Sequence, residues 1–316
     1  MSFNIFIIIS LITVIIYSIL YYARMLRIGI TSRALFNLDA SHLVFKNNGL
    51  EAYKEHQVSL ENTPLDPGEA FTLVKKLLSL NNLYEGEKLS EVILLSRNTA
   101  DTGLRVFNSI QYHDLDIKKA AFCGGNSPHI YAKSFGADLF LSTELEDCKS
   151  SMKNGIAAAK IIPSKISMAE DKTLKVAFDG DSVLFSEESQ QIFDQQGLDA
   201  FNKNEKDFAN KPLTGGPFKS FLTELYKIQQ SFSKKECPIR IALVTARSAP
   251  SHERVIKTLR DWKIRIDESL FLGGLEKKDF LKDFGADIFF DDQIENCLAA
   301  SLEVPTGQVI NFNTRN

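Results

Sequence analysis

The chain has 316 residues, 44% of them apolar and 24% charged, a composition typical of a globular protein long enough for two domains. A formal net charge of −3 argues against the basic surface that nucleic-acid binding needs, so we predict no nucleic-acid partner. The cysteines form no C-x-x-C pair, which argues against a metal or disulfide framework and favours free thiols; they are Cys123, Cys148, Cys237 and Cys297.

The first predicted element is an apolar helix. Residues 3–22 carry no charge, and a helix of that length spans about 30 Å, the thickness of the hydrocarbon core of a bilayer. We predict a membrane anchor within residues 1–25; a cleaved signal peptide and a buried strand or core helix are the alternatives. Because Arg24, Arg27 and Arg33 follow the segment, the positive-inside rule predicts that the rest of the chain lies in the cytoplasm. A cytoplasmic protein without an anchor is the alternative location.

The chain after this segment repeats itself. The sequence "FGAD" at residues 135–138 recurs at residues 284–287, an offset of 149, and a Phe-x-Gly-Gly pattern recurs at the same offset. Other blocks match at an offset of 148. Chance resemblance would not keep one register over a whole half, so we predict a tandem duplication with halves at residues 26–170 and 171–316.

Strands and helices alternate in both halves. In the first half we predict an amphipathic helix at residues 71–80 and strands at residues 26–30, 91–96 and 138–142. In the second half the matching helix is at residues 218–228, and the matching strands are at residues 174–178, 241–245 and 287–292. This alternation predicts a parallel sheet in each half, with helices on both faces and right-handed crossovers.

The two halves differ in the polar residues near their strand ends. In the second half these residues are Asp179, Asp181, Thr245, Lys277, Asp291 and Asp292. The matching positions of the first half hold no carboxylate and no lysine. Since the first half forms the same elements without them, these side chains serve function in the second half. A solvated Asp-Gly turn at residues 179–181 is the alternative.

Carboxylates that converge at one sheet edge repel one another unless a cation neutralises them, and Mg²⁺ prefers oxygen ligands. We predict that Asp179, Asp181, Asp291 and Asp292 bind Mg²⁺. Asp179 can also attack phosphorus as a nucleophile, and Asp181 can protonate the leaving oxygen and then activate water. Thr245 and Lys277 can hold the other phosphate oxygens. The residues thus predict a Mg²⁺-dependent phosphomonoesterase.

These motifs resemble those of the haloacid dehalogenase superfamily of phosphatases: D-x-D-x-[TV] at residues 179–183, Thr245, Lys277 and the acidic pair 291–292. Longer stretches, among them "FDGDSVLFS", "KPLTGGPFKSFL", "TSRALF" and "AFCGGNSP", resemble the cytosolic type I 5′-nucleotidases. The resemblance covers nearly all of residues 26–309.

The resemblance implies an α/β fold class: two tandem Rossmann-like, haloacid dehalogenase-like halves, with a small helical cap between Ser186 and Gly216. With the predicted transmembrane helix in front, this is the complete predicted fold. The resemblance also implies Mg²⁺-dependent hydrolysis of nucleoside 5′-monophosphates, AMP prominently. We assign Gly180, Arg247 and Ser248, which neighbour the motifs, to substrate binding.

A second polar group lies at the strand ends of the first half: Thr31, Ser32, Arg33, Ser96, Arg97 and Asn98. It has two cations and no acid among its members, and we predict that Arg33, Arg97 and Asn98 bind an anion, either a regulatory nucleotide or part of the substrate. Ordinary loop capping is the alternative. For the whole protein, the alternatives are a phosphatase or phosphotransferase for another small phosphomonoester, and a silent, membrane-tethered nucleotide-binding protein. A nucleotide effector and a homo-oligomer stay open.

Overall fold

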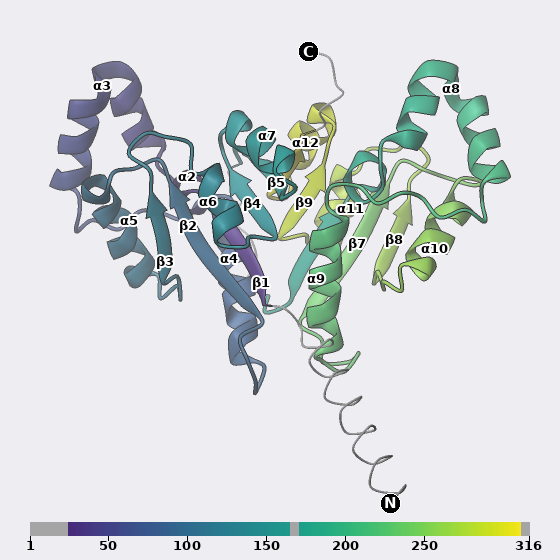
Figure 1. The fold of residues 1–316 in the computed structure, drawn as a ribbon, viewed down its shortest axis with the longest axis horizontal. Helices are drawn as coiled ribbons and strands as arrows, with labels where there is room; N and C mark the ends of the chain where they lie inside the picture. Colours follow the sequence, from purple (N-terminus) through teal and green to yellow (C-terminus); the bar gives the residue numbers. More distant parts are fainter. Residues whose placement is uncertain (1–24, 165–170, 311–316) are drawn as a thin grey trace, which may run out of the picture.

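The computed structural model describes residues 25–164 and 171–310; residues 1–24, 165–170 and 311–316 lie outside the described part. Within it, ten strands form one sheet in the order β3-β2-β1-β4-β5-β10-β9-β6-β7-β8, with helices on both faces (Figure 1). Neighbouring strands are parallel except β5 and β10, which pair antiparallel.

The first half holds the first five strands. They are β1 (Leu26–Ile30), β2 (Ser90–Ser96), β3 (Lys119–Phe122), β4 (Leu139–Ser142) and β5 (Ala157–Ile162). Its helices are α2 (Ser32–Leu35), α3 (Asp39–Ser59), α4 (Phe71–Ser79), η1 (Leu80–Asn82), α5 (Ala100–Tyr112), α6 (His129–Ser134) and α7 (Leu145–Lys153).

The second half repeats this order. Its strands are β6 (Leu174–Phe178), β7 (Ile239–Thr245), β8 (Glu268–Phe271), β9 (Ile288–Asp291) and β10 (Thr306–Val309). Its helices are η2 (Gly180–Leu184), α8 (Glu188–Asp207), α9 (Lys219–Gln230), α10 (His252–Asp261), α11 (Lys278–Phe284) and α12 (Ile294–Ala300). All the predicted strands and both predicted helices are present, with ends shifted by a few residues. The domain boundaries at residues 26–170 and 171–316 stay a prediction.

The prediction of separate sheets is wrong in one respect: both halves share a single sheet, joined by the antiparallel pair of β5 and β10. Two strands per half were missed. β5 begins with three alanines, and β10 is four residues long with Gly307 and Gln308 at its centre; neither shows a clear alternation of apolar and polar residues. β3 and β8 are short edge strands that are only partly buried.

The fold class also needs a correction at its N-terminus. In the part of the chain that the structure describes, no helix is long and apolar enough to cross a bilayer. The predicted transmembrane helix at residues 3–22 lies outside the described residues. The corrected fold class is therefore an α/β fold without a transmembrane helix.

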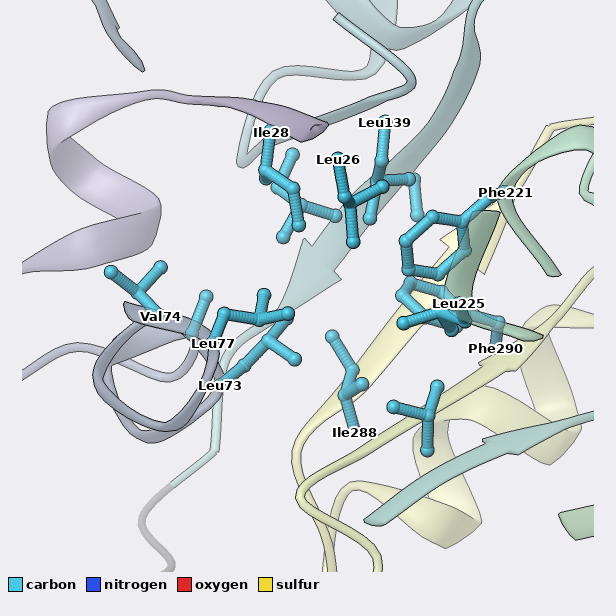
Figure 2. Packing of buried hydrophobic residues seen from close by; sticks show 14 of the residues in the cluster. Leu26, Ile28, Leu73, Val74, Leu77, Leu139, Phe221, Leu225, Ile288 and Phe290 are labelled. Carbon is cyan, nitrogen blue, oxygen red and sulfur yellow. The ribbon is translucent and has the colours of Figure 1, made fainter. Parts of the chain in front are cut away.

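Each face of the sheet carries its own layer of helices. α4, α5, α9 and α10 cover one face and contribute to the largest apolar cluster, which contains residues of both halves. Figure 2 shows Leu73 and Leu77 of α4 in the same cluster as Leu225 of α9, with Phe290 of β9 beside Leu225. α6 and α7 cover the other face in the first half, and α11 and α12 do so in the second. The shared cluster makes the two halves one packed body.

The helices α3 and α8 occupy matching places at the outer ends of the molecule (Figure 1). Each is kinked at a glycine with a left-handed backbone, Gly49 with φ +83° and Gly197 with φ +80°. Glycine adopts this conformation without steric cost. The predicted cap over the site thus corresponds to α8, and the first half keeps a counterpart of it.

One buried ion pair joins the halves. Lys76 of α4 donates from Nζ to Asp287 Oδ1 at 2.8 Å and to the carbonyl of Thr173 at 2.9 Å. Asp287 is fully buried and also accepts a hydrogen bond from the backbone N–H of Lys175 at 2.8 Å. The pair therefore links a helix of the first half to the residue that directly precedes β9 in the second.

We expect Lys76→Met to lower the free energy of unfolding by about 3–5 kcal/mol, because it leaves the Asp287 carboxylate buried without its cation. Lys75→Met is the matched control: Lys75 is its exposed neighbour on α4, and its replacement should change stability by less than about 0.5 kcal/mol. Urea denaturation of both variants measures the difference. Equal stabilities would show that the buried pair makes no net contribution.

Candidate active site

Three neighbouring strands of the second half bring the predicted motifs together at their carboxyl ends. β6 lies between β9 and β7, and all three are parallel. Asp179 follows β6, and its backbone N–H donates to the carbonyl of Phe290 at 2.8 Å. Thr245 ends β7 beside Gly180, where an added Cβ would lie 3.3 Å from Thr245 Oγ1. The small residue between the two aspartates thus allows β6 and β7 to end in close contact.

The turn after Asp179 is strained. Ser182, in η2, has φ +64°, a left-handed conformation that costs a residue with a side chain about 1–3 kcal/mol. Ser182 is buried, as is Asp179. Strain of this kind is held in place by the surrounding structure and is common at functional sites.

Three carboxylates form one acidic cluster. Oxygens of Asp179, Asp291 and Asp292 all lie within 4.8 Å of one another. Burial is the main cause that raises the pKa of Asp292 to about 8, and the charges of Asp179 and Asp291 add to it. Burial likewise raises the pKa of Asp179, although Lys277 opposes the shift. A cation among these oxygens would relieve both the burial cost and the repulsion.

Lys277 supplies positive charge to the cluster. Its Nζ lies 2.6 Å from Asp179 Oδ1 and 2.6 Å from Asp291 Oδ2. Burial lowers the pKa of Lys277, but the two carboxylates outweigh this and the net shift is upward, so the side chain is an ammonium. When all three carboxylates are ionised, they and the Lys277 ammonium carry a formal charge of −2, which one Mg²⁺ would balance.

The adjacent aspartates of β9 have different surroundings. Asp291 is fully buried, and its two oxygens accept hydrogen bonds from Lys277, from the backbone N–H of Gln293 at 2.9 Å and from Asn296. Asp292 is only partly buried. Asp291 is therefore placed to hold Lys277 and the start of the following chain, and the choice of Asp292 as the direct metal ligand stays a prediction.

Asp181 lies outside this acidic cluster, because a guanidinium holds its carboxylate. Arg247 donates to Asp181 through Nε at 2.7 Å and through Nη2 at 2.6 Å, a bidentate pair. The other side of Arg247 binds Glu205 of the cap helix α8, and Arg254 donates to the same carboxylate at 2.9 Å. Two carboxylates and two guanidinium groups balance, so this network needs no metal. The role of Asp181 as a metal ligand stays a prediction.

Sequence reasoning missed Glu205 and Arg254, although the repeat contained the signal. At the two offsets, Glu205 matches Gln57 and Arg254 matches Arg105 of the first half. There Arg105 donates to Gln57 Oε1 at 3.0 Å, in the same arrangement without the carboxylate. The comparison of charges between halves that singled out the strand-end aspartates would have found this position too.

The other residues predicted to bind substrate have distinct surroundings. Arg247 is 4% exposed, and the contacts above occupy its guanidinium. Ser248 is exposed on the same loop, and an added Cβ at Gly273 would lie 3.5 Å from its Cβ. Thr245 Oγ1 accepts a hydrogen bond from the backbone N–H of Arg247 at 3.3 Å. Substrate binding by Gly180, Arg247 and Ser248 stays a prediction.

The polar group of the first half contains carboxylate partners that the sequence did not reveal. Arg97 binds Asp147 Oδ1 at 2.5 Å, and Asp147 is almost fully buried. Arg33 lies 3.3 Å from Asp39 and 3.7 Å from Glu144. Both predicted anion-binding arginines are thus partly neutralised.

Asn98 takes part in the same region. Its Oδ1 accepts a hydrogen bond from Tyr53 at 2.8 Å, and the hydroxyls of Ser32 and Ser96 lie 3.0 Å apart. The described part of the first half holds no group of three possible metal ligands comparable to the cluster of the second half. The anion site at Arg33, Arg97 and Asn98 stays a prediction.

Comparison with known proteins places this site in a family. The family model described as 5′-nucleotidase matches residues 20–316. The chain belongs to the 5′-nucleotidase family. It is 40% identical to human cytosolic 5′-nucleotidase 1B over 278 residues, which cover 84% of this chain and 46% of that protein. The predicted resemblance to the cytosolic type I 5′-nucleotidases is confirmed, and the chain spans about half the length of this curated relative.

A search of solved structures adds nothing to this assignment. A histidinol dehydrogenase from Elizabethkingia anophelis aligns with a TM-score of 0.24 and 13% identity, over 91% of this chain and 54% of that one. A score this low carries no argument about fold or activity.

Proposed function

We propose that the protein is a Mg²⁺-dependent 5′-nucleotidase, which hydrolyses nucleoside 5′-monophosphates to nucleoside and phosphate through an aspartyl-phosphate. One observation carries the proposal: the carboxylates of Asp179, Asp291 and Asp292 converge within 4.8 Å of one another at the ends of two neighbouring parallel strands. Family membership supports the same activity.

The cluster suits Mg²⁺ because all of its donors are carboxylate oxygens, the ligands that this ion prefers. Asp179 and Asp292 would hold the ion, with Asp291 behind them. Bound there, Mg²⁺ would offset the charge of the phosphate dianion. Lys277 would bind a phosphate oxygen, and the hydroxyl of Thr245 would donate to another.

The protein residues divide the reaction between them. A carboxylate oxygen of Asp179 attacks phosphorus, the bond from phosphorus to the 5′ oxygen breaks, and Asp181 gives that oxygen its proton. A water molecule then attacks the aspartyl-phosphate while Asp181 takes a proton from it, which releases phosphate and restores Asp179. Each oxygen of Asp181 accepts one hydrogen bond from Arg247 and keeps a second lone pair for these transfers. Arg247 is thus placed to orient Asp181 rather than to bind substrate.

The test is a phosphate-release panel. AMP, the other ribonucleoside and deoxyribonucleoside 5′-monophosphates and glycerol 2-phosphate are incubated with Mg²⁺ or with EDTA. We expect release from one or more nucleotides with Mg²⁺ and none with EDTA. Release that continues undiminished in EDTA would remove the metal from the proposal, and no release from any nucleotide would overturn it.

The two aspartates of β9 should respond differently to substitution. We expect Asp292→Asn to raise the Mg²⁺ concentration that gives half-maximal activity by more than about ten-fold, because it removes a charged ligand. Asp291→Asn should raise it less, since that side chain mainly holds Lys277 and the chain at Gln293. Magnesium titrations of activity measure both. The opposite ranking would make Asp291 the direct ligand.

We also propose a cytoplasmic location, on the basis of the word "cytosolic" in the name of the human relative. Cell fractionation with an antibody to the chain tests it. The predicted bilayer contact through residues 3–22 lies outside the described residues. The homo-oligomer and the nucleotide effector stay predictions.

A further inference from the structure

A pocket of about 290 Å³ lies where the two halves meet. The first half contributes the end of α7 and the start of β5, and the second contributes η2 and the loops that flank α8. The lining residues used in the argument below are Met152, Gly155, Ile156, Ser182, Ser186 and Gly216. Ser182 follows Asp181 directly, so the pocket adjoins the candidate active site.

The antiparallel joint between the halves explains how the first half reaches this place. Gln308 of β10 is level with Asp291 on one side and with Lys160 of β5 on the other. Because β5 runs in the opposite direction, residues 155–157, which precede Lys160, lie beyond the carboxyl ends of the second half's strands. That is the edge from which Asp179 projects. β5 and β6 are three strand spacings apart, about 14 Å.

The chemistry of the pocket favours an uncharged occupant with a flat apolar body. Apolar side chains such as Met152 and Ile156 form much of the wall, and none of its described lining residues is Lys or Arg. A second phosphate would find no cation there. The lining does include one carboxylate, Glu187, which could accept a hydrogen bond from an amino or hydroxyl group of a ligand.

A buried hydroxyl points to the same occupant. Ser186 lines the pocket, and its Oγ is turned inward, where it has no hydrogen-bond partner among the described residues; rotation about its Cα–Cβ bond would present it to a ligand. A buried hydroxyl without a partner is costly, and a ligand that supplies a donor or acceptor would remove that cost. The base and the sugar of a nucleoside both carry such groups.

We propose that this pocket binds the nucleoside of a nucleoside 5′-monophosphate whose phosphate lies at Asp179, and that the first half thereby selects nucleotides over other phosphomonoesters. The inference rests on the proposed 5′-nucleotidase function. It gives the half that lacks the carboxylates a direct part in substrate recognition, through Met152 and Ile156. Catalysis and substrate selection then come from different copies of one duplicated unit.

The experiment compares two substrates, AMP and glycerol 2-phosphate, which has no nucleoside. Met152→Trp and Ile156→Trp fill the pocket from the first half. We expect each to lower the ratio of kcat/KM for AMP to that for glycerol 2-phosphate by at least about ten-fold, mainly through a higher KM for AMP. Lys153→Trp is the matched control, because Lys153 is exposed on α7 and does not line the pocket. The control should leave the ratio unchanged.

Ser186→Ala provides a second test that does not depend on accommodating a large side chain. Loss of one hydrogen bond to the nucleoside should lower the same ratio roughly five-fold. Thermal unfolding checks that each variant is folded. A ratio within two-fold of the unsubstituted protein in the folded variants would overturn the pocket assignment while leaving the nucleotidase proposal intact. An unsubstituted protein that hydrolyses no nucleoside 5′-monophosphate would overturn both.

Discussion

We expect Asp179→Asn to lower kcat for AMP by about 10⁴-fold or more, because it removes the nucleophile of the proposed reaction. The amide has nearly the same size as the carboxylate, and Lys277 keeps its contact with Asp291 at 2.6 Å. The fold should therefore survive the change. Phosphate release in the presence of Mg²⁺ measures the rate, and circular dichroism and thermal unfolding check the structure.

The matched control is Asp199→Asn, the same chemical change at an exposed position of α8. It should leave the rate unaltered. A folded Asp179→Asn protein that retains Mg²⁺-dependent hydrolysis within about ten-fold of the unsubstituted rate would exclude Asp179 as the nucleophile. Trapping of phosphate label on the unsubstituted chain, and its absence in the variant, would give independent support.

The second large effect is expected at Asp181. We expect Asp181→Asn to lower kcat for AMP by about 10²–10⁴-fold, the usual loss when a positioned acid and base is removed. Both chemical steps should suffer, because Asp181 first donates a proton to the leaving oxygen and then accepts one from water.

The leaving group separates these two roles. 4-Nitrophenolate leaves without help from an acid, so the first step with 4-nitrophenyl phosphate should stay fast in Asp181→Asn while the second step stays slow. Rapid mixing should then show a burst of 4-nitrophenolate equal to the enzyme concentration. A normal rate with AMP would remove Asp181 from the mechanism. A slow reaction with AMP, together with no burst from 4-nitrophenyl phosphate, would confine the role of Asp181 to the first step.

The network around Asp181 shows what the two halves share. Arg254 donates to Glu205 in the second half, as Arg105 donates to Gln57 at the matching place in the first. In each half a serine of the outer helix also donates to that Glu or Gln side chain. In the second half the network carries full charges and ends at Asp181. In the first half Ser32 stands at the position that matches Asp181. The two halves thus share one arrangement of these side chains, although the carboxylates are present in the second half alone.

Local patterns were enough to predict the main elements and the acidic positions. A short, mainly apolar run such as residues 174–178, followed by Gly180, predicts a strand that is buried on both faces of a parallel sheet. A residue that follows such a strand must lie at the carboxyl edge, so Asp179 and Asp292 could be placed from their positions along the chain. The repeat then provided an internal control, since the first half forms the same strands without carboxylates.

Contacts between residues distant in sequence could not be predicted in this way. The pairing of β5 with β10 joins two strands that have no clear alternation, and hydrogen bonds between them stabilise both. Arg247 and Asp181 are 66 positions apart, and Lys76 and Asp287 are 211 apart. Nothing local specifies such partners, because a charged side chain pairs with whichever opposite charge the packed helices and strands bring to it. The order of residues thus accounts for the strands and the acids that end them, whereas the single sheet, the neutral network at Asp181 and the pocket between the halves depend on how the two copies pack.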